Sequence, residues 1–306
     1  VAPHAGRIHR NDEDVPEGII RELSVIGCFG LSIPTEYGGS NDGDSSEFLR
    51  MLLATEELSR GSLAAAGSLI TRPEIVVSAL LQGGTDSQKE RWLPCIANGS
   101  RMCAVAVTEP DYGSDVAQLS TTATRRGDEW IVNGTKTWCT FVGRAEYLLL
   151  LARTSSDRSL RHRGLSLFIV EKPACSGHSF SLTQDGGGEM IAHAIPTIGY
   201  RGMHSFEITF RDWSLPHSGL IGMDDGVGRG FYLQMHAFAA GRLQTAGRAL
   251  GVMESSFEEA LRYTQERLVF GRPLSEFELT RMKMPRMAIS IVACREFATA
   301  VARRLS

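Results

Sequence analysis

The sequence lacks an excess of charge of either sign, and it lacks a long apolar segment. Its 306 residues carry 32 basic and 35 acidic side chains, for a formal net charge of −3, which gives no support to a nucleic-acid-binding function. The longest apolar run, residues 147–152, is strand-sized and far shorter than the roughly 18 residues of a membrane span. The N-terminus shows no apolar secretion signal. We therefore expect a cytoplasmic protein without a membrane or nucleic-acid partner.

Recognisable metal, disulfide and nucleotide motifs are also missing. The six cysteines lie far apart without a C-x-x-C pair, and the eight histidines form no H-x-x-x-H or H-E-x-x-H motif. We expect no metal site and no disulfides, and we predict that the cysteines are buried free thiols. The P-loop, the G-x-S-x-G motif and a G-x-G-x-x-G after a predicted strand are absent. Their absence excludes the commonest nucleotide-binding and serine-hydrolase sites.

What is present is a normal globular composition, 42% hydrophobic and 22% charged. Helical periodicity dominates before Asn98 and again after Gly230, whereas short β-forming runs occupy residues 103–216. This order predicts an α+β fold with separate domains rather than alternating βαβ units. We expect an N-terminal helical domain (1–101), a central antiparallel β domain (102–217) and a C-terminal helical domain (218–306). The last helical pattern ends without a cap, so we expect a sequence truncated at both ends.

Two segments within the β region could bind a ligand. The strand ending at Thr108 leads into a loop with Gly113 and Ser114, whose hydroxyl and backbone N–H groups suit a pyrophosphate, although a surface turn is an equally good interpretation. Asn133-Gly134 predicts a hairpin with a type I′ turn. On its second arm, Trp138 and Thr140 are two residues apart and share a face, so they could contact a flat heterocycle together; a core tryptophan is the alternative.

Taken together, these motifs resemble the acyl-CoA dehydrogenase family. The matching segments, in the family's order and approximate spacing, are Thr108-Glu-Pro, Gly113-Ser-Asp, Asn133-Gly-Thr-Lys, Trp138-Cys-Thr and Arg267-Leu-Val-Phe-Gly. The resemblance covers essentially the whole chain. It implies FAD bound between the β domain and the C-terminal helical bundle, and dehydrogenation of an acyl-CoA thioester at its α and β carbons. It also implies a homo-oligomer, usually a tetramer, and an electron-transfer flavoprotein as the acceptor.

The resemblance also implies roles for individual residues. In similar proteins the residue matching Thr108 hydrogen-bonds the flavin, those matching Trp138 and Thr140 lie against its ring, and those matching Arg267 and Phe270 reach the FAD of a neighbouring subunit. The implied cofactor-binding residues are Val107, Thr108, Gly113, Ser114, Trp138, Thr140, Arg267 and Phe270.

For the substrate, the resemblance implies contacts of Ser114 and Arg242 with the CoA portion. The family's catalytic base is a glutamate. In one branch its position aligns with Gly241, which cannot abstract a proton, and in the commoner branch it lies further along the bundle. We therefore expect the base C-terminal to Ser306.

The segment 185–207 is longer than in fatty-acyl members and resembles the methylsuccinyl-CoA dehydrogenase branch, whose substrate carries a second carboxylate. Arg201 or His204 could bind that carboxylate, although a structural role for Arg201 is a strong alternative. Two other functions stay open. One is an acyl-CoA oxidase or a flavin monooxygenase on the same scaffold, and the other is a non-catalytic scaffold that binds CoA or flavin.

Overall fold

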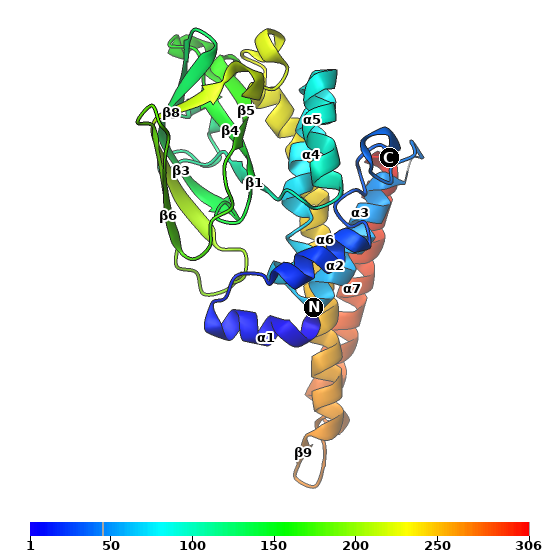
Figure 1. Cartoon of the computed structure of the whole chain (residues 1–306). Coiled ribbons are helices and arrows are strands. Elements are labelled where there is room, and N and C mark those ends of the chain that lie inside the picture. The colour runs from blue at the N-terminus through cyan, green and yellow to red at the C-terminus, as the bar shows by residue number, and fades with distance from the viewer. Residues whose placement is uncertain (45, 306) are drawn as a thin grey trace.

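The computed structural model describes residues 1–44 and 46–305, and it shows a curved β domain on one side of a group of helices (Figure 1). The helices precede and follow the strands in the chain, as the sequence predicted. The helices are α1 (Ala2–Asn11), α2 (Glu17–Val25), α3 (Glu47–Gly61), α4 (Thr71–Gly83), α5 (Asp86–Ala97), α6 (Gly230–Glu266) and α7 (Glu278–Leu305).

The β domain is an eight-stranded sheet in the order β1-β4-β2-β3-β8-β7-β6, with β5 paired to β4. Most pairs are antiparallel, as we predicted for this domain, although β1 and β2 run parallel to β4. The parallel β1–β4 pair is possible because a long crossover containing β2 and β3 joins the two strands. The strands are β1 (Cys103–Ala106), β2 (Thr122–Arg126), β3 (Glu129–Thr140), β4 (Tyr147–Arg153), β5 (Leu165–Glu171), β6 (Ser179–Thr183), β7 (Glu189–Ala194) and β8 (Ser205–Pro216).

The predicted hairpin at Asn133-Gly134 is wrong. β3 runs through this pair as one strand, and the turn between β2 and β3 lies at Gly127-Asp128. Asn133 instead pairs across the sheet with Asp212: its Nδ2 donates to Asp212 Oδ1, and its Oδ1 accepts from the Asp212 backbone N–H, both at 2.9 Å. The Asn133 side chain, which would favour a turn, instead stabilises a bulge between β3 and β8.

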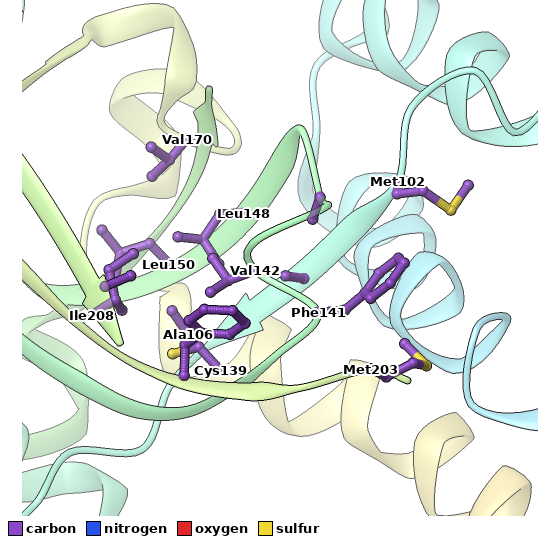
Figure 2. Close-up of a cluster of buried hydrophobic side chains, with 14 of the residues drawn as sticks. Met102, Ala106, Cys139, Phe141, Val142, Leu148, Leu150, Val170, Met203 and Ile208 are labelled. Carbon is purple, nitrogen blue, oxygen red and sulfur yellow. The ribbon is translucent and has the colours of Figure 1, made fainter. Parts of the chain in front are cut away.

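The core of the β domain continues into its boundary with the helices. Leu148 and Leu150 of β4 are fully buried, and Figure 2 shows them in one cluster with Phe141 and Met203. Burying each such side chain stabilises the fold by about 1.5–3 kcal/mol. The apolar run that we predicted to be a strand is therefore a central strand.

The helices pack closely because small residues lie at their contacts. A Cβ atom at Gly251 of α6 would lie 2.2 Å from the carbonyl oxygen of Glu56 on α3, so glycine is needed for this crossing. The segment Leu63–Gly83, which contains α4, is apolar and long enough to span a membrane, but 83% of its most apolar window is buried within the protein. It is thus a core helix of this fold.

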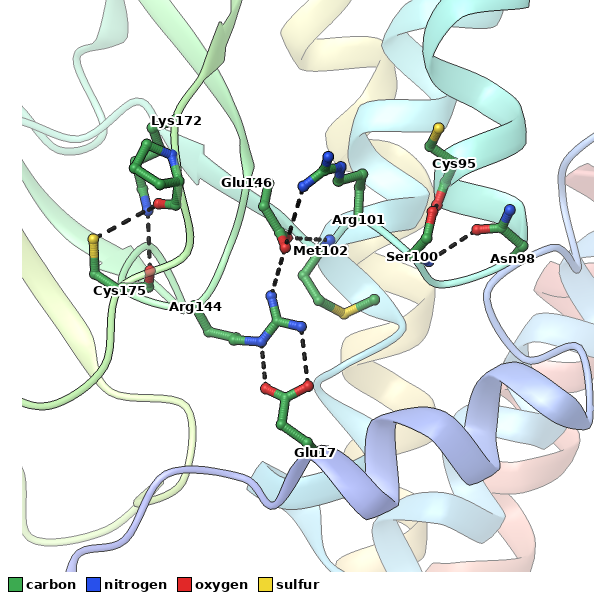
Figure 3. Close-up of polar contacts among 12 residues, drawn as sticks. Glu17, Cys95, Asn98, Ser100, Arg101, Met102, Arg144, Glu146, Lys172 and Cys175 are labelled. Carbon is green, nitrogen blue, oxygen red and sulfur yellow. Dashed lines mark hydrogen bonds and ion pairs between the residues drawn. The ribbon is translucent and has the colours of Figure 1, made fainter.

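One arginine connects the N-terminal helices to the β domain (Figure 3). Arg144 forms a two-pronged ion pair with Glu17 of α2, and its Nη1 donates to Glu146 Oε1 at 2.8 Å. Glu146 Oε2 in turn accepts from the backbone N–H of Met102, at the start of the β domain, at 2.9 Å. This chain of contacts fixes α2 against the edge of the sheet.

All six cysteines are free, as predicted, but only part of the burial prediction is right. Cys28, Cys103 and Cys139 are buried, whereas Cys95 and Cys175 are half-buried and Cys294 is exposed. Cys294 lies on a face of α7 that no described residue covers fully, so its apolar sequence neighbours misled the prediction.

Candidate functional site

A cavity of about 320 Å³ lies between the β domain and helices α4 and α6. The sequence-predicted residues that meet here are Val107, Thr108, Trp138, Thr140 and Arg242. Gly241 lines the same cavity, and no Asp or Glu lines it among residues 1–44 and 46–305. Its volume is at the lower end of the range for small-molecule sites, about 300–1,000 Å³, which suits the reacting end of a larger ligand.

A bulge in β3 turns Trp138 into the cavity. The pairing of β3 with β8 shifts register between Lys136 and Cys139, and Trp138 adopts a positive φ of 57°. Its side chain is 55% exposed, unusual for a tryptophan in a central strand. Thr140 lines the cavity too, with its hydroxyl 2.8 Å from that of Ser205. We predicted that Trp138 and Thr140 share a face by simple strand alternation; they do share the cavity, but the bulge places them there.

A buried ion pair anchors the strands that carry these residues. Lys136 Nζ lies 2.9 Å from Glu109 Oε1 and donates to the carbonyl oxygen of Val107 at 3.0 Å. Glu109 also accepts from the backbone N–H and hydroxyl of Ser120 and from the backbone N–H of Thr121. Burial raises the pKa of Glu109, but the Lys136 charge and these hydrogen bonds outweigh it and hold the pKa at about 2. Burial lowers the pKa of Lys136, yet its contact with Glu109 keeps the pair ionised.

Two half-buried arginines face the cavity from the helices. Arg72 comes from α4 and Arg248 from α6, and neither forms an ion pair with an acidic side chain of the described chain. Arg248 Nε is buried and has no hydrogen-bond partner among the described atoms. Gly241 and Thr245 share a face of α6 with Arg248 because they precede it by seven and three residues. The cavity therefore offers positive charge beside an apolar wall.

Tyr200 holds the two arginines from behind. Arg72 Nη1 and Arg248 Nη1 donate to its hydroxyl oxygen at 3.1 and 2.9 Å, and the hydroxyl donates to Ser68. Burial raises the pKa of Tyr200, but the charges of Arg72 and Arg248 outweigh it and lower the pKa below its usual value. The segment 185–207, singled out from the sequence, thus contributes to this site through Tyr200.

The other predicted cofactor residues lie outside the cavity. Gly113 and Ser114 are on an exposed loop after β1. Arg267 and Phe270 belong to the hairpin of β9 (Leu268–Val269) and β10 (Arg272–Pro273) that joins α6 to α7, at the far end of the molecule in Figure 1. Phe270 is 94% exposed. The structure of one chain does not bring these residues together with Trp138.

Arg201 and His204 are also away from the cavity. Arg201 Nη1 donates to the carbonyl oxygen of His9 at 2.9 Å and lines a separate cavity of about 290 Å³. His204 contacts Asp12 and Asp14. Besides the predicted Arg242, the cationic side chains at the main cavity are Arg72 and Arg248, which the sequence analysis missed. A signal for Arg72 was available, since it is the basic residue at the start of the largely apolar helix α4, but its position beside Arg248 appears only in three dimensions.

Comparison with known proteins identifies the family. Models for the N-terminal, middle and C-terminal domains of acyl-CoA dehydrogenases match residues 1–100, 104–213 and 228–306. The chain is 32% identical to isovaleryl-CoA dehydrogenase of Pongo abelii over 99% of its own length and 67% of that protein. The chain belongs to the acyl-CoA dehydrogenase family. This membership confirms the resemblance seen in the motifs and the predicted helical, β and helical domains.

Other relatives of this acyl-CoA dehydrogenase family member have dicarboxylic substrates in their names. The chain is 42% identical to (2S)-methylsuccinyl-CoA dehydrogenase of Cereibacter sphaeroides over 97% of its length, but it spans only 52% of that protein. A glutaryl-CoA dehydrogenase solved with glutaryl-CoA superposes with a TM-score of 0.88 at 26% identity, covering 99% of this chain and 72% of that one. The chain thus spans between about half and three quarters of these relatives.

Proposed function

We propose that the protein catalyses FAD-dependent α,β-dehydrogenation of an acyl-CoA whose acyl group carries a second carboxylate, such as methylsuccinyl-CoA. Family membership and the convergence of Val107, Thr108, Trp138 and Thr140 on one cavity support the reaction class. Arg72 and Arg248, which form no ion pair with an acidic side chain of the described residues, support a substrate with a second carboxylate. Since the relatives extend beyond this chain, the proposal concerns the whole protein.

The cavity fits a flavin ring. Trp138 offers a flat apolar surface that is more than half exposed, and the hydroxyl groups of Thr108 and Thr140 lie at the same cavity. When bound, FAD accepts a hydride from the β-carbon of the acyl group. The chain's part is to hold ring and substrate in register, and its apolar side chains Ile75 and Phe238 keep water from the reacting carbons.

Removal of the α-proton needs a base, and we place the base, a glutamate in this family, C-terminal to Ser306. Gly241 lines the cavity, at the position that aligns with the glutamate of one branch. A Cβ atom there would make ordinary van der Waals contact with Ile75, 3.4 Å away, so the site has space for a side chain. Gly241 leaves that space open to the acyl group.

The second carboxylate of the substrate would bind to Arg72 and Arg248. Tyr200 holds both guanidinium groups in place from the opposite side, which lowers the entropy lost when they grip a ligand. A hydrogen bond to a charged group contributes about 1.5–3 kcal/mol, or about 10- to 150-fold in kcat/KM. The names of the methylsuccinyl-CoA and glutaryl-CoA relatives agree with a dicarboxylic substrate.

The test compares methylsuccinyl-CoA with butyryl-CoA, which lacks the second carboxylate. We expect the Arg248→Met holoenzyme to lose about 10- to 150-fold in kcat/KM for methylsuccinyl-CoA, with a much smaller change for butyryl-CoA. Arg242→Met is the matched control: Arg242 lines the same cavity but is assigned to the CoA portion, so both substrates should suffer equally. Equal turnover of the two substrates by the wild type, or an equal loss for both in Arg248→Met, would reject the dicarboxylic substrate.

Three further parts of the proposal follow from the family. Ser114, beside Gly113, would contact phosphate groups from its exposed loop, and Arg267 with Phe270 would reach the FAD of a second subunit in a homotetramer. An electron-transfer flavoprotein would accept the electrons. Slow reoxidation of the reduced protein in air supports this acceptor, whereas rapid reoxidation with release of hydrogen peroxide would indicate an acyl-CoA oxidase.

A further inference from the structure

Three side chains from distant parts of the sequence converge where α1 ends. Asp12 follows α1, His178 precedes β6 and His204 precedes β8. His204 Nε2 lies 3.1 Å from His178 Nε2 and 3.1 Å from Asp12 Oδ1, and His178 Nε2 lies 3.6 Å from Asp12 Oδ2. One potential ligand atom of each residue lies within 4.8 Å of the other two. We refer to these three residues as the Asp12 cluster.

We propose that the Asp12 cluster binds one zinc ion that connects α1 to the β domain. Zinc holds imidazole nitrogens and carboxylate oxygens at about 2.0–2.2 Å in a tetrahedron, so two ligand atoms of one ion lie about 3.4 Å apart. The two imidazole Nε2 atoms, 3.1 Å apart, are close to that edge, and each lies 3.1–3.6 Å from one of the two carboxylate oxygens of Asp12. Two histidines and one carboxylate leave a fourth position for water.

The hydrogen bonds around His204 present the correct nitrogen to the ion. His204 Nδ1 lies 2.9 Å from Asp14 Oδ1, and Asp14 is itself held by the backbone N–H of Gly177 at 3.2 Å. A neutral imidazole that donates through Nδ1 has its lone pair on Nε2, the atom that faces His178 and Asp12. A carboxylate that orients a histidine in this way is the usual outer partner of a zinc ligand.

The exposure of the three side chains also suits an ion that enters from the solvent. The His204 side chain is 7% exposed and fixed, whereas those of His178 and Asp12 are 51% and 40% exposed, which gives the ion an entry path. Arg201 Nε lies 3.5 Å from Asp12 Oδ1, so zinc would share this carboxylate with a guanidinium group. Asp12 has a φ of 54°, a backbone conformation that aspartate tolerates better than most residues and that directs it to the two histidines.

The competing explanation is an ion-pair network without metal. In that case the two imidazoles are joined by a hydrogen bond between their Nε2 atoms, 3.1 Å apart, to which a neutral His178 in the Nε2–H tautomer donates and His204 accepts. Both explanations attach α1 to the β domain. They differ in whether zinc binds with defined stoichiometry, and that is what the experiment measures.

The test is a zinc titration of the purified full-length holoprotein after chelator treatment and dialysis, followed by calorimetry and by metal analysis. We expect one zinc ion per chain and a melting temperature that rises with zinc. His178→Gln should abolish saturable binding, and Asp14→Asn should weaken it about 10- to 100-fold, the usual effect of losing an outer partner. His193→Gln is the matched control, since His193 is an exposed histidine on the neighbouring strand β7 outside the cluster.

Absence of saturable zinc binding by the wild type, or unchanged binding by His178→Gln, would overturn the proposal. His178 is half exposed, so its replacement should leave the fold intact, which the far-ultraviolet circular dichroism spectrum checks. Asp12→Asn provides a second variant from another element of the cluster. Binding of Co²⁺ in place of zinc, with the intense visible bands of a tetrahedral site, would support the proposed geometry.

Discussion

Replacement of Lys136 by methionine should destabilise the protein strongly, because it leaves the Glu109 carboxylate buried without its cation. The Lys136 side chain is fully buried and that of Glu109 is 2% exposed. Breaking a buried ion pair by removing one partner typically costs about 3–5 kcal/mol. Glu109 keeps three hydrogen-bond donors from Ser120 and Thr121, so we expect a loss near the lower end, about 3 kcal/mol at pH 7.

The pH dependence of this effect has a definite sign. In the folded wild type the pKa of Glu109 is about 2, below its ordinary value of 4.5, so its charge contributes up to about 3 kcal/mol of stability above pH 4.5. This contribution disappears as the pH falls toward 2. In Lys136→Met the carboxyl can relieve its burial by taking up a proton. The difference between variant and wild type should therefore shrink as the pH is lowered from 7 to 4.

Urea unfolding followed by circular dichroism at several pH values measures this difference. The double variant Glu109→Gln/Lys136→Met is the control, since removing both charges should restore more than half of the lost stability at pH 7. A loss of less than about 1 kcal/mol in Lys136→Met at pH 7, or a double variant less stable than Lys136→Met, would show that the ion pair does not stabilise the fold in this way. The same ion pair holds the strands that carry Val107 and Trp138, so the single variant should also lose flavin.

Three further predictions address other parts of the fold. Burial raises the pKa of Glu74 to about 7, so ionisation of this carboxyl destabilises the folded state as the pH rises from 4.5 to 7. The free energy of unfolding of Glu74→Gln, measured with urea, should therefore exceed that of the wild type by up to about 3 kcal/mol at pH 8 and by little at pH 5. Gly134→Ala should lower the free energy of unfolding by about 1–3 kcal/mol, because Gly134 has a φ of 141° and a Cβ there would lie 2.6 Å from Thr121 Oγ1. Gly186→Ala, where a Cβ would meet no atom within 4 Å, is the control and should leave the free energy of unfolding unchanged. Phe270→Ser should weaken FAD retention and tetramer formation in gel filtration with little change in melting temperature, because Phe270 is 94% exposed; unchanged flavin content and mass would contradict its assigned role.

The sequence predicted those elements whose signal is local. The apolar run 147–152 is β4, and the helices lie on either side of the strands as their periodicity indicated. The prediction at Asn133-Gly134 failed because a turn-forming asparagine can also pair across a sheet, as Asn133 does with Asp212. Nothing in the spacing of residues distinguishes these two uses.

The sequence predicted the site only in part, namely those residues that belong to local motifs. Val107, Thr108, Trp138 and Thr140 belong to motifs and meet at one cavity. Their exact placement depends on a bulge that sequence alternation does not reveal.

Residues that act together from separate elements were missed. Arg72 and Arg248 lie on different helices and meet at Tyr200, which comes from the β domain. The Asp12 cluster likewise combines three segments, so a search for spaced motifs expected no metal. Such sites depend on tertiary packing and become visible only when the fold is known.

The visible absorption spectrum of the purified full-length protein tests whether it binds FAD and oxidises methylsuccinyl-CoA. It is recorded without oxygen before and after addition of methylsuccinyl-CoA, with butyryl-CoA in a parallel sample. We expect flavin bands that bleach with methylsuccinyl-CoA and bleach more slowly with butyryl-CoA. Flavin bands that persist with methylsuccinyl-CoA would contradict the proposed substrate, and the absence of flavin bands would contradict the proposed cofactor and favour a non-catalytic scaffold.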